Sequence, residues 1–260
     1  MIATSVVAVL GLGEAGGRLA ADLVSAGVEV HGYDPMTSAP EGVAQAGDPA
    51  AAVSESSVVL ALTTAATALA AAESALPGLC AGAVYADLNT ASPALKREIA
   101  ALVAGAGARF ADVALLGAVP VHGLRTPTLA SGPGAQAFAD VFRPVGMPVE
   151  VVSDRPGDAA IRKLVRSVFM KGLAASVFES LRAADAAGQA SWLEREIAAV
   201  IGEPLFERLI EGSRRHALRR VDEMQAAREL LLELGVEPRI TAASASVLAE
   251  LAARAEEHGR

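Results

Sequence analysis

The sequence predicts an α/β protein in which an N-terminal doubly wound parallel sheet is followed by an all-helical C-terminal domain. Up to about residue 155, short runs rich in β-branched residues alternate with alanine-rich amphipathic stretches, which is typical of βαβ crossovers. After Pro156 the strand pattern stops and only helical periodicity continues. We therefore expect two domains, covering residues 1–156 and 157–260.

The expected strands of the first domain are short apolar runs, at Val6–Leu10, Val28–Tyr33, Val58–Leu62, Val84–Asp87 and Phe110–Leu115, with a later pair near Thr128–Ala130 and Val149–Val152. Amphipathic stretches between them predict helices near 14–26, 65–76, 92–104 and 135–143. In the second domain, helices are expected over 157–188, 191–201, 203–212, 214–235 and 240–256. Their ends are marked by Gly188, Gly202, Gly235 and Pro238.

Composition excludes several classes of partner. A chain of 260 residues, 52% of them hydrophobic, is long enough to bury a substantial core. The formal net charge of −8 excludes an overall basic field that would attract nucleic acid or anionic lipid. The longest uncharged stretch, Ser56–Ala72, is 17 residues, which is short for a membrane span, and the N-terminus lacks the basic region of a secretory signal. We expect a cytoplasmic protein without nucleic-acid or membrane partners.

The single cysteine and the four histidines do not suggest redox or metal chemistry. Cys80 has no second cysteine with which to form an intramolecular disulfide, and we expect it to be a small buried apolar residue. The histidines are scattered and show no metal-ligand spacing: His31, His122, His216 and His258. The sequence therefore predicts no metal site.

A glycine-rich turn follows the first expected strand and opens the first helix. In this Gly-x-Gly-x-x-Gly pattern, Gly11 permits a tight turn, Gly13 lets a pyrophosphate approach the backbone, and Gly16 lets helix and strand pack closely. The helix N-terminus favours the phosphate charge. This context predicts a Rossmann dinucleotide site contacted by Gly11, Leu12, Gly13, Glu14, Ala15 and Gly16. The alternative is a glycine-rich turn without a ligand.

Asp34 ends the second strand, eighteen residues after Gly16, where a carboxylate accepts hydrogen bonds from the adenosine ribose. It also repels a 2′-phosphate, and no Arg or Lys lies between Pro35 and Glu41 to bind one. NAD is therefore favoured over NADP. A turn role before Pro35 is compatible with this one. Thr63 and Thr64 follow the third strand, where the loop passes under a dinucleotide; alternatively they cap the next helix.

The helix starting near residue 157 carries cations on one face. At about 100° per residue, one arc holds Lys163, Arg166, Ser167 and Lys171, and the opposite arc holds Ile161, Leu164, Val165 and Val168. By itself this is an amphipathic helix with a solvated cationic face. Farther along, the Lys163 stripe leads to apolar Val177, Phe178 and Leu181. A stripe that is buried there is expected to be covered near its start too, which favours a functional Lys163.

Several segments carry a family resemblance: "GLGEAGG", "ADLNTASP" at 86–93, "DVALLGAVP" at 112–120, "GDAAIRKLVRS" at 157–167 and "HALRRVDEMQAARELLLELGVEP" at 216–238. Together they resemble the β-hydroxyacid dehydrogenase superfamily, which includes 3-hydroxyisobutyrate and 6-phosphogluconate dehydrogenases. More narrowly, the chain is similar to a branch with a short helical C-terminal domain. The resemblance implies an NAD(P)-dependent oxidoreductase that transfers a hydride between nicotinamide and a β-hydroxyacid or a related anionic alcohol or aldehyde.

The resemblance also implies a catalytic lysine. The family's G-x-G-x-x-x-K spacing is reproduced from Gly157 to Lys163, with Ala159 at the second glycine. Ser167 stands where relatives hold substrate with an asparagine. Arg166 and Lys171 border the same arc, where they would meet an anionic substrate. In this interpretation Lys163 removes the hydroxyl proton of an alcohol, or donates a proton in the reductive direction.

Two further segments are implied to bind substrate. After the fourth strand the family has a D-x-S-T-x-x-P pattern, and here Asn89 replaces the serine before Thr90; both are expected to contact substrate, and Asn89 also the nicotinamide. Alternatively, Asn89–Ser92 caps the helix that begins at Pro93. In the family's A-P-V-S-G-G motif, Leu116 replaces the serine, which leaves backbone contacts at Gly117 and Ala118.

The C-terminal helices offer one more candidate face, formed by His216, Arg219, Arg220 and Glu223. It is either a solvated, salt-bridged surface or a cover for the active site that a dimer partner supplies. The second interpretation implies a homodimer through the helical domain, with His216 near the substrate. Two alternative functions stay open, an imine reductase and a dinucleotide-binding protein without turnover. Loss of turnover with retained cofactor binding in Lys163→Ala would separate an enzyme from the latter.

Overall fold

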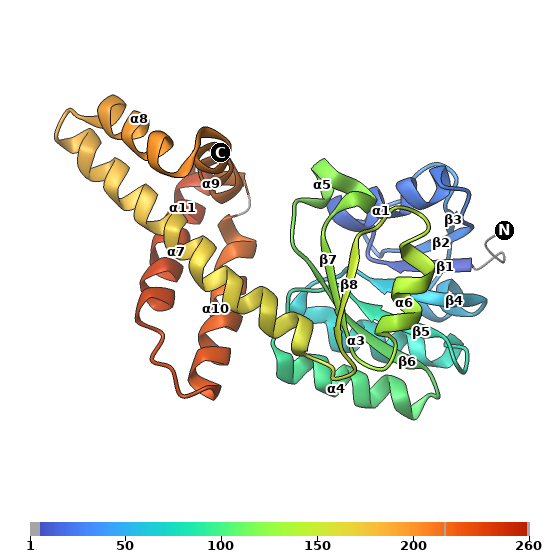
Figure 1. Ribbon diagram of the computed structural model, residues 1–260. Coiled ribbons are helices and arrows are strands. Elements are labelled where there is room, and N and C mark those ends of the chain that lie inside the picture. The colour runs from blue at the N-terminus through green and yellow to red at the C-terminus, as the bar shows by residue number, and fades with distance from the viewer. Residues whose placement is uncertain (1–5, 216, 259–260) are drawn as a thin grey trace. The chain divides into compact units, whose positions relative to one another are not determined.

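The computed structural model describes residues 6–215 and 217–258, with the side chains of 255–258 left out (Figure 1). The chain forms two compact units, one ending at Lys163 and one starting at Leu164. Helix α7 (Asp158–Ala186) contains this division, because its first residues belong to the sheet unit.

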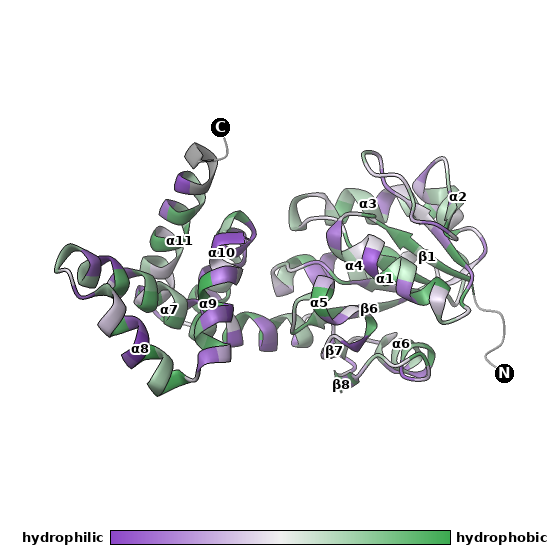
Figure 2. Ribbon diagram, turned by 90° about the horizontal axis from the view of Figure 1, so that it is seen from above, coloured by the Kyte–Doolittle hydropathy of each residue, from purple (hydrophilic) through white to green (hydrophobic). Residues whose placement is uncertain are grey.

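The first unit is built on an eight-stranded sheet with the order β3-β2-β1-β4-β5-β6-β7-β8. Its strands are β1 (Val6–Leu10), β2 (Val30–Tyr33), β3 (Ala44–Gln45), β4 (Ser56–Ala61), β5 (Val84–Asp87), β6 (Arg109–Leu115), β7 (Thr128–Ser131) and β8 (Val149–Ser153). Neighbouring strands are parallel except β6 and β7, which are antiparallel. The α/β fold class is confirmed. The strands are mainly hydrophobic along their length (Figure 2), as expected for a sheet covered on both faces.

Helices cover both faces of this sheet: α1 (Glu14–Ser25), α2 (Pro49–Val53), α3 (Ala68–Ala75), α4 (Pro93–Gly105), α5 (Val119–His122) and α6 (Ala135–Phe142). Alternate residues of β1 enter opposite cores. Val7 and Val9 pack with α1 and α6, and Ala8 and Leu10 pack with α2, α3 and α4. Short 3-10 turns lie at Ala65–Thr67, Leu76–Gly78 and Gly123–Arg125. Because helices cover both faces of the sheet, a ligand site is expected at the carboxyl ends of the strands.

The second unit continues α7 and adds α8 (Ala190–Ile201), α9 (Glu203–Arg215), α10 (Ala217–Glu233) and α11 (Arg239–His258). The all-helical prediction for this part of the chain is confirmed. One core cluster joins Ala174 and Val177 of α7 to Leu209 of α9, and another joins Phe178 to Val247 of α11. No helix in the described part of the chain has the length and apolarity that a bilayer crossing requires.

The expectation of a buried cysteine was wrong. Cys80 is exposed, in the loop after the turn Leu76–Gly78, and its thiol donates to the carbonyl oxygen of Ser54 at 3.0 Å. Leu79, the residue before it, takes the buried position at 8% exposure. The loop can turn only one of these two neighbours inward, and the larger apolar side chain gains more from burial.

Candidate active site

The glycine turn between β1 and α1 contains two positions at which a larger side chain would clash. Gly11 has a φ of +93° and donates its amide to the carbonyl oxygen of Tyr33 at 2.8 Å. A Cβ at Gly11 would lie 2.3 Å from the carbonyl oxygen of Leu62, and one at Gly16 would lie 1.9 Å from that of Gly11. A Cβ at Gly13 would meet nothing within 4 Å. Two glycines are therefore needed for packing, and the third leaves its backbone open to a phosphate at the N-terminus of α1.

Replacing Gly16 with alanine is expected to weaken dinucleotide binding by at least about tenfold, because the new methyl group would displace the carbonyl of Gly11 and reshape the turn. Titration of NADH fluorescence measures this affinity. Gly47→Ala is a matched control, because a Cβ at Gly47 meets nothing within 4 Å. Wild-type affinity in Gly16→Ala would contradict the placement of the cofactor at this turn.

The carboxylate of Asp34 holds the glycine turn as well as its own turn. Its Oδ2 accepts the amide of Leu12 at 2.8 Å, and its Oδ1 accepts the amides of Met36 and Thr37 at 2.8 and 3.0 Å. An ionised carboxylate has about four acceptor positions, so one is left for a ribose hydroxyl. The turn role is present, and the ribose contact stays a prediction.

The loops after β4 and β5 meet at Thr63 and Asn89. Asn89 is 7% exposed, and its side-chain nitrogen donates to Asp87 Oδ1 at 2.6 Å and lies 3.4 Å from Thr63 Oγ1. Thr64 caps the turn Ala65–Thr67 together with Thr67. Ser92 caps α4, because its hydroxyl accepts the amide of Leu95 at 3.3 Å. Asn89 is therefore oriented by Asp87, and the capping of α4 belongs to Ser92.

Lys163 and Thr90 are in direct contact, although 73 positions separate them in the sequence. The ammonium of Lys163 donates to the hydroxyl of Thr90 at 2.7 Å. The chain enters α7 through Gly157, whose φ is +99° and whose Cβ would lie 3.2 Å from the Cβ of Pro93. A glycine is thus required where the start of α7 approaches the start of α4, which explains the glycine that precedes Lys163 in the motif.

A buried ionic cluster that the sequence analysis did not predict lies beside these residues. Lys96 Nζ is 3.1 Å from Asp87 Oδ2 and 3.2 Å from Asp112 Oδ1, and all three side chains are at most 1% exposed. Lys96 also donates to the carbonyl oxygen of Asp87 at 2.8 Å. Burial lowers the pKa of Lys96, but the charges and hydrogen bonds of Asp87 and Asp112 outweigh it, so the pKa is raised.

A sequence signal for this cluster did exist. Lys96 lies on the stripe of α4 that also holds Ile99, Ala100 and Val103, which are all buried. A lysine within an apolar stripe indicates a buried charge with a partner. Only three of the 22 Lys and Arg residues are lysines, and each of these donates a hydrogen bond inside the fold.

The residues of α7 that are exposed and buried in the helical unit do not match the two arcs expected from the sequence. Val165 and Phe169 are 49% and 69% exposed, whereas Ser167 is 1% exposed. The reason is Glu223 on α10, which accepts the hydroxyl of Ser167 and pairs with Lys171 Nζ at 2.8 Å. Burial, the largest effect, lowers the pKa of Lys171 despite Glu223. The polar stripe is therefore covered at Ser167 and Lys171, and Val165 does not belong to a buried arc.

Gly117 and Ala118 lie exposed in the loop between β6 and α5, and Arg166 is exposed on α7. Arg219 is exposed on α10, and the guanidinium of Arg220 donates to the hydroxyl of Ser213. His216 lies outside the described residues. Within the described residues, no group of three His, Cys, Asp or Glu side chains is placed to hold a metal ion.

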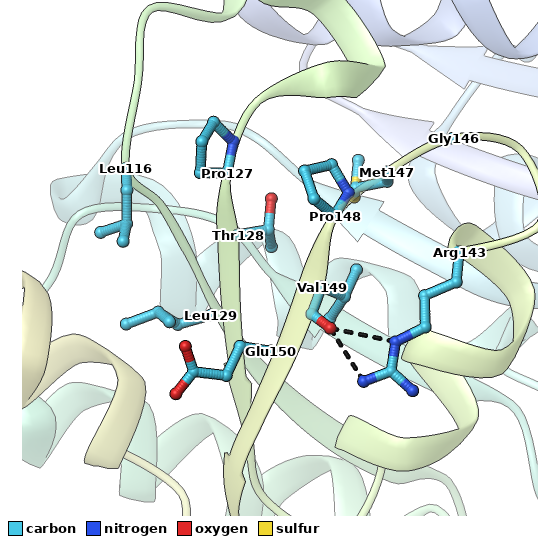
Figure 3. A pocket seen from close by; sticks show the side chains of 10 residues that line it. All are labelled: Leu116, Pro127, Thr128, Leu129, Arg143, Gly146, Met147, Pro148, Val149 and Glu150. Atoms are coloured by element: carbon cyan, nitrogen blue, oxygen red, sulfur yellow. Dashed lines mark hydrogen bonds between the residues drawn. The ribbon is translucent and has the colours of Figure 1, made fainter.

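An open hollow of about 590 Å³ lies over β7 and β8 (Figure 3). It is lined by Leu116, Pro127, Thr128, Leu129, Arg143, Gly146, Met147, Pro148, Val149 and Glu150. Arg143 is held by the carbonyl oxygen of Val149 at 3.0 and 2.8 Å, and Glu150 pairs with Arg162 at 2.8 Å. Lys163, Thr90 and Asn89 are not among the residues that line this hollow.

Comparison with known proteins identifies the family. A family model described as the NAD binding domain of 6-phosphogluconate dehydrogenase matches residues 6–145. The chain belongs to the β-hydroxyacid dehydrogenase superfamily. A second model, a domain of unknown function called DUF1932, matches residues 184–251. The superfamily consists of NAD(P)-dependent dehydrogenases and reductases, which supports a nicotinamide cofactor and an oxidoreductase.

Individual relatives agree with this superfamily. An uncharacterized 28.5 kDa protein from the 7S RNA 5′ region of Methanothermus fervidus is 26% identical over 158 residues, which are 60% of this chain and 61% of that protein. The match thus spans less than two thirds of that relative. Conserved protein MTH1747, described as structurally similar to 3-hydroxyacid dehydrogenases, is 28% identical with a TM-score of 0.72, covering 98% of this chain and 99% of that one.

Two more distant structures share the fold. The 3-hydroxyisobutyrate dehydrogenase of Salmonella typhimurium has a TM-score of 0.81 at 18% identity, covering 95% of this chain and 93% of that one. The imine reductase of Streptomyces aurantiacus has a TM-score of 0.66 at 22% identity, covering 95% and 94%. Both structures therefore share the fold of this chain, and the fold alone does not distinguish between their substrates.

Proposed function

We propose that this protein transfers a hydride between a nicotinamide dinucleotide and a β-hydroxyacid or a related anionic alcohol or aldehyde. The observation that carries the proposal is the contact between Lys163 and Thr90 at 2.7 Å, next to the buried Asn89. A bound nicotinamide supplies or accepts the hydride. An amine at this position provides the proton transfer that oxidation of an alcohol or reduction of an aldehyde also requires.

In this proposal, different residues of the sheet unit carry out proton transfer and substrate binding. Lys163 removes the hydroxyl proton or returns it, and the Thr90 hydroxyl holds its amine in place. The acidic end of the substrate lies near Asn89, Thr90 and the backbone of Gly117 and Ala118. The substrate roles expected for Arg166, Ser167, Lys171 and His216 stay predictions, and Glu223 already compensates the charge of Lys171.

The proposal is tested with the whole chain and a panel of substrates. NADH and NADPH oxidation is followed spectrophotometrically with aldehyde acids, uncharged aldehydes and cyclic imines. We expect turnover with the aldehyde acids and none with the imines. Turnover of imines alone would assign an imine reductase, and dinucleotide binding without turnover of any compound would assign a binding protein.

We further propose that NAD is preferred over NADP, because Asp34 places a negative charge beside the glycine turn. Replacing Asp34 with asparagine removes the charge but keeps one acceptor oxygen, and is expected to reduce the preference for NAD by about tenfold or more. Thermal-shift titrations with both dinucleotides measure the ratio. Glu41→Gln is the matched control, since Glu41 is an exposed acid nearby. An unchanged ratio in Asp34→Asn would contradict the proposal.

We also propose a homodimer formed through the helical domain. Support comes from large apolar side chains of that unit that are more than half exposed: Phe169, Trp192, Val200, Leu218, Leu232, Leu234 and Ile240. Exposed apolar surface of this kind is typical of protein interfaces. Light scattering on the whole chain gives the mass, and a monomer at all concentrations would contradict this proposal.

A further inference from the structure

We propose that Lys96 is a positioning residue of the active site, which holds the loop of Asn89 and Thr90 and the start of α7 in register so that Lys163 reaches Thr90. This inference rests on the proposed function, because that function makes Lys163 the proton carrier. It assigns to Lys96, Asp87 and Asp112 a purpose beyond filling the core.

Asp87 and Asp112 are partners in the register of β5 and β6, and both carboxylates are at most 1% exposed. Like charges opposite each other on neighbouring strands repel, and neither carboxylate is open to water. The ammonium of Lys96 lies 3.1 and 3.2 Å from them, and its bond to the carbonyl oxygen of Asp87 fixes it there. Lys96 is therefore what holds both carboxylates in their places.

Asp87 is hydrogen-bonded to the loop that contains Asn89 and Thr90. Its Oδ1 accepts the amide of Asn89 at 3.0 Å and the side chain of Asn89 at 2.6 Å. These two bonds set both the backbone and the side chain of Asn89 directly after β5. Thr90, the next residue, is thereby placed to accept the hydrogen bond of Lys163.

Asp112 is hydrogen-bonded to the start of α7, the helix that carries Lys163. Its Oδ2 accepts the backbone amide of Ala160 at 2.9 Å and lies 3.2 Å from the hydroxyl of Ser131, which accepts the amide of Ala159 at 2.9 Å. A carboxylate at a helix N-terminus is stabilised by the helix dipole. Lys163 follows Ala159 by four residues, about one helical turn. One ammonium thus anchors both sides of the contact between Lys163 and Thr90.

Removal of the Lys96 ammonium changes the surroundings of both carboxylates. Two buried, opposed carboxylates must then move apart or admit water, since unpaired buried charges are costly. Either change alters the acceptor oxygens that hold Asn89, Ala160 and Ser131. The expected consequence is a shift of Thr90 relative to Lys163, and the glycine turn of the cofactor is not part of these contacts.

The experiment compares three variants of the whole chain. Lys96→Met removes the ammonium. Lys96→Met with Asp112→Asn also removes one carboxylate, which restores the net charge of the cluster and guards against a failure to fold. Arg97→Met is the matched control, because Arg97 is the exposed neighbour of Lys96 on α4. NADH titration selects the variants that keep wild-type cofactor affinity and are therefore folded.

The main readout does not depend on activity. Competitive acetylation with acetic anhydride over a range of pH, followed by peptide mass spectrometry, gives the reactivity of the Lys163 amine, and with only three lysines in the chain its peptide is unambiguous. We expect Lys163 to react several-fold faster in the folded Lys96 variants and as in the wild type in Arg97→Met. With an active substrate, kcat should fall by about 10²-fold, as for a misplacement of about 1 Å, with an unchanged KM for the dinucleotide.

Wild-type reactivity of Lys163 over the whole pH range in the folded double variant would overturn the proposal. If neither Lys96 variant folds, Asp112→Asn alone replaces them; it keeps the Lys96–Asp87 pair and weakens the anchor of α7, and unchanged reactivity there overturns the proposal equally. Failure of the proposed function gives a different result. In that case the substrate panel gives turnover of imines alone or no turnover, whereas the acetylation of Lys163 still reports whether Lys96 positions it.

Discussion

Replacement of Lys163 by alanine is expected to lower kcat by about 10²–10⁴-fold, the usual contribution of a positioned general acid or base. The amine of Lys163 is held at 2.7 Å from the Thr90 hydroxyl, and the other lysine of the sheet unit, Lys96, is paired with Asp87 and Asp112. Dinucleotide affinity should be unchanged, because the glycine turn lies on β1 and α1. Steady-state kinetics with the best aldehyde acid, together with NADH titration, measures both quantities.

The matched control is Arg162→Ala. Arg162 precedes Lys163 on α7 and pairs with Glu150 at 2.8 Å, with both side chains at least half exposed. Such surface pairs contribute about 0–1 kcal/mol, so this variant should fold and turn over as the wild type does. If Lys163→Ala also turned over as the wild type does, Lys163 would not be the proton carrier.

Replacement of Lys96 by methionine is expected to lower the free energy of unfolding by about 3–5 kcal/mol, the cost of leaving a buried ionic partner uncompensated. For a chain of this size that corresponds to a decrease in Tm of roughly 6–20 °C. Calorimetry measures the change. Arg97→Met, an exposed change on the same helix, should stay within about 0.5 kcal/mol of the wild type.

The pH dependence of this loss follows from the direction of the pKa shift. The folded pKa of Lys96 is raised above its ordinary value of 10.5, so its contribution is fully present below pH 10.5 and is lost only as pH rises through the folded value. The stability difference between the wild type and Lys96→Met should therefore be the same at pH 7 and pH 9 as far as Lys96 is concerned. A difference that vanished by pH 9 would contradict the buried ion pair.

Local patterns predicted most of the elements. Val84–Asp87 and Val6–Leu10 are strands with the expected bounds, because a short β-branched run between turn residues has little alternative. The short elements β3, α2 and α5 were missed, since two to five residues carry no measurable periodicity. Helix α4 begins at Pro93 behind a serine cap, as its sequence indicates.

In the candidate site, too, features within a few residues were predicted, whereas contacts between distant residues were not. Gly11, Gly13 and Gly16 lie close together in the chain, so their spacing, together with the strand before them and the helix after them, predicts their roles. Lys163 was predicted from its motif, but its partner Thr90 is 73 positions away. The expected arcs on α7 were wrong at Val165, because helical periodicity does not tell which face a second helix will cover.

By itself, the sequence determined the α/β part, the helical part that follows it and the glycine turn after β1, because these depend on propensities and spacings within a few residues. Only the tertiary structure decided that Lys96 is buried between Asp87 and Asp112, that Glu223 covers Ser167 and Lys171, and that Asp34 holds the amide of Leu12. Those contacts join residues far apart in the chain. The energy of a charged group depends on which partners and how much water surround it after folding.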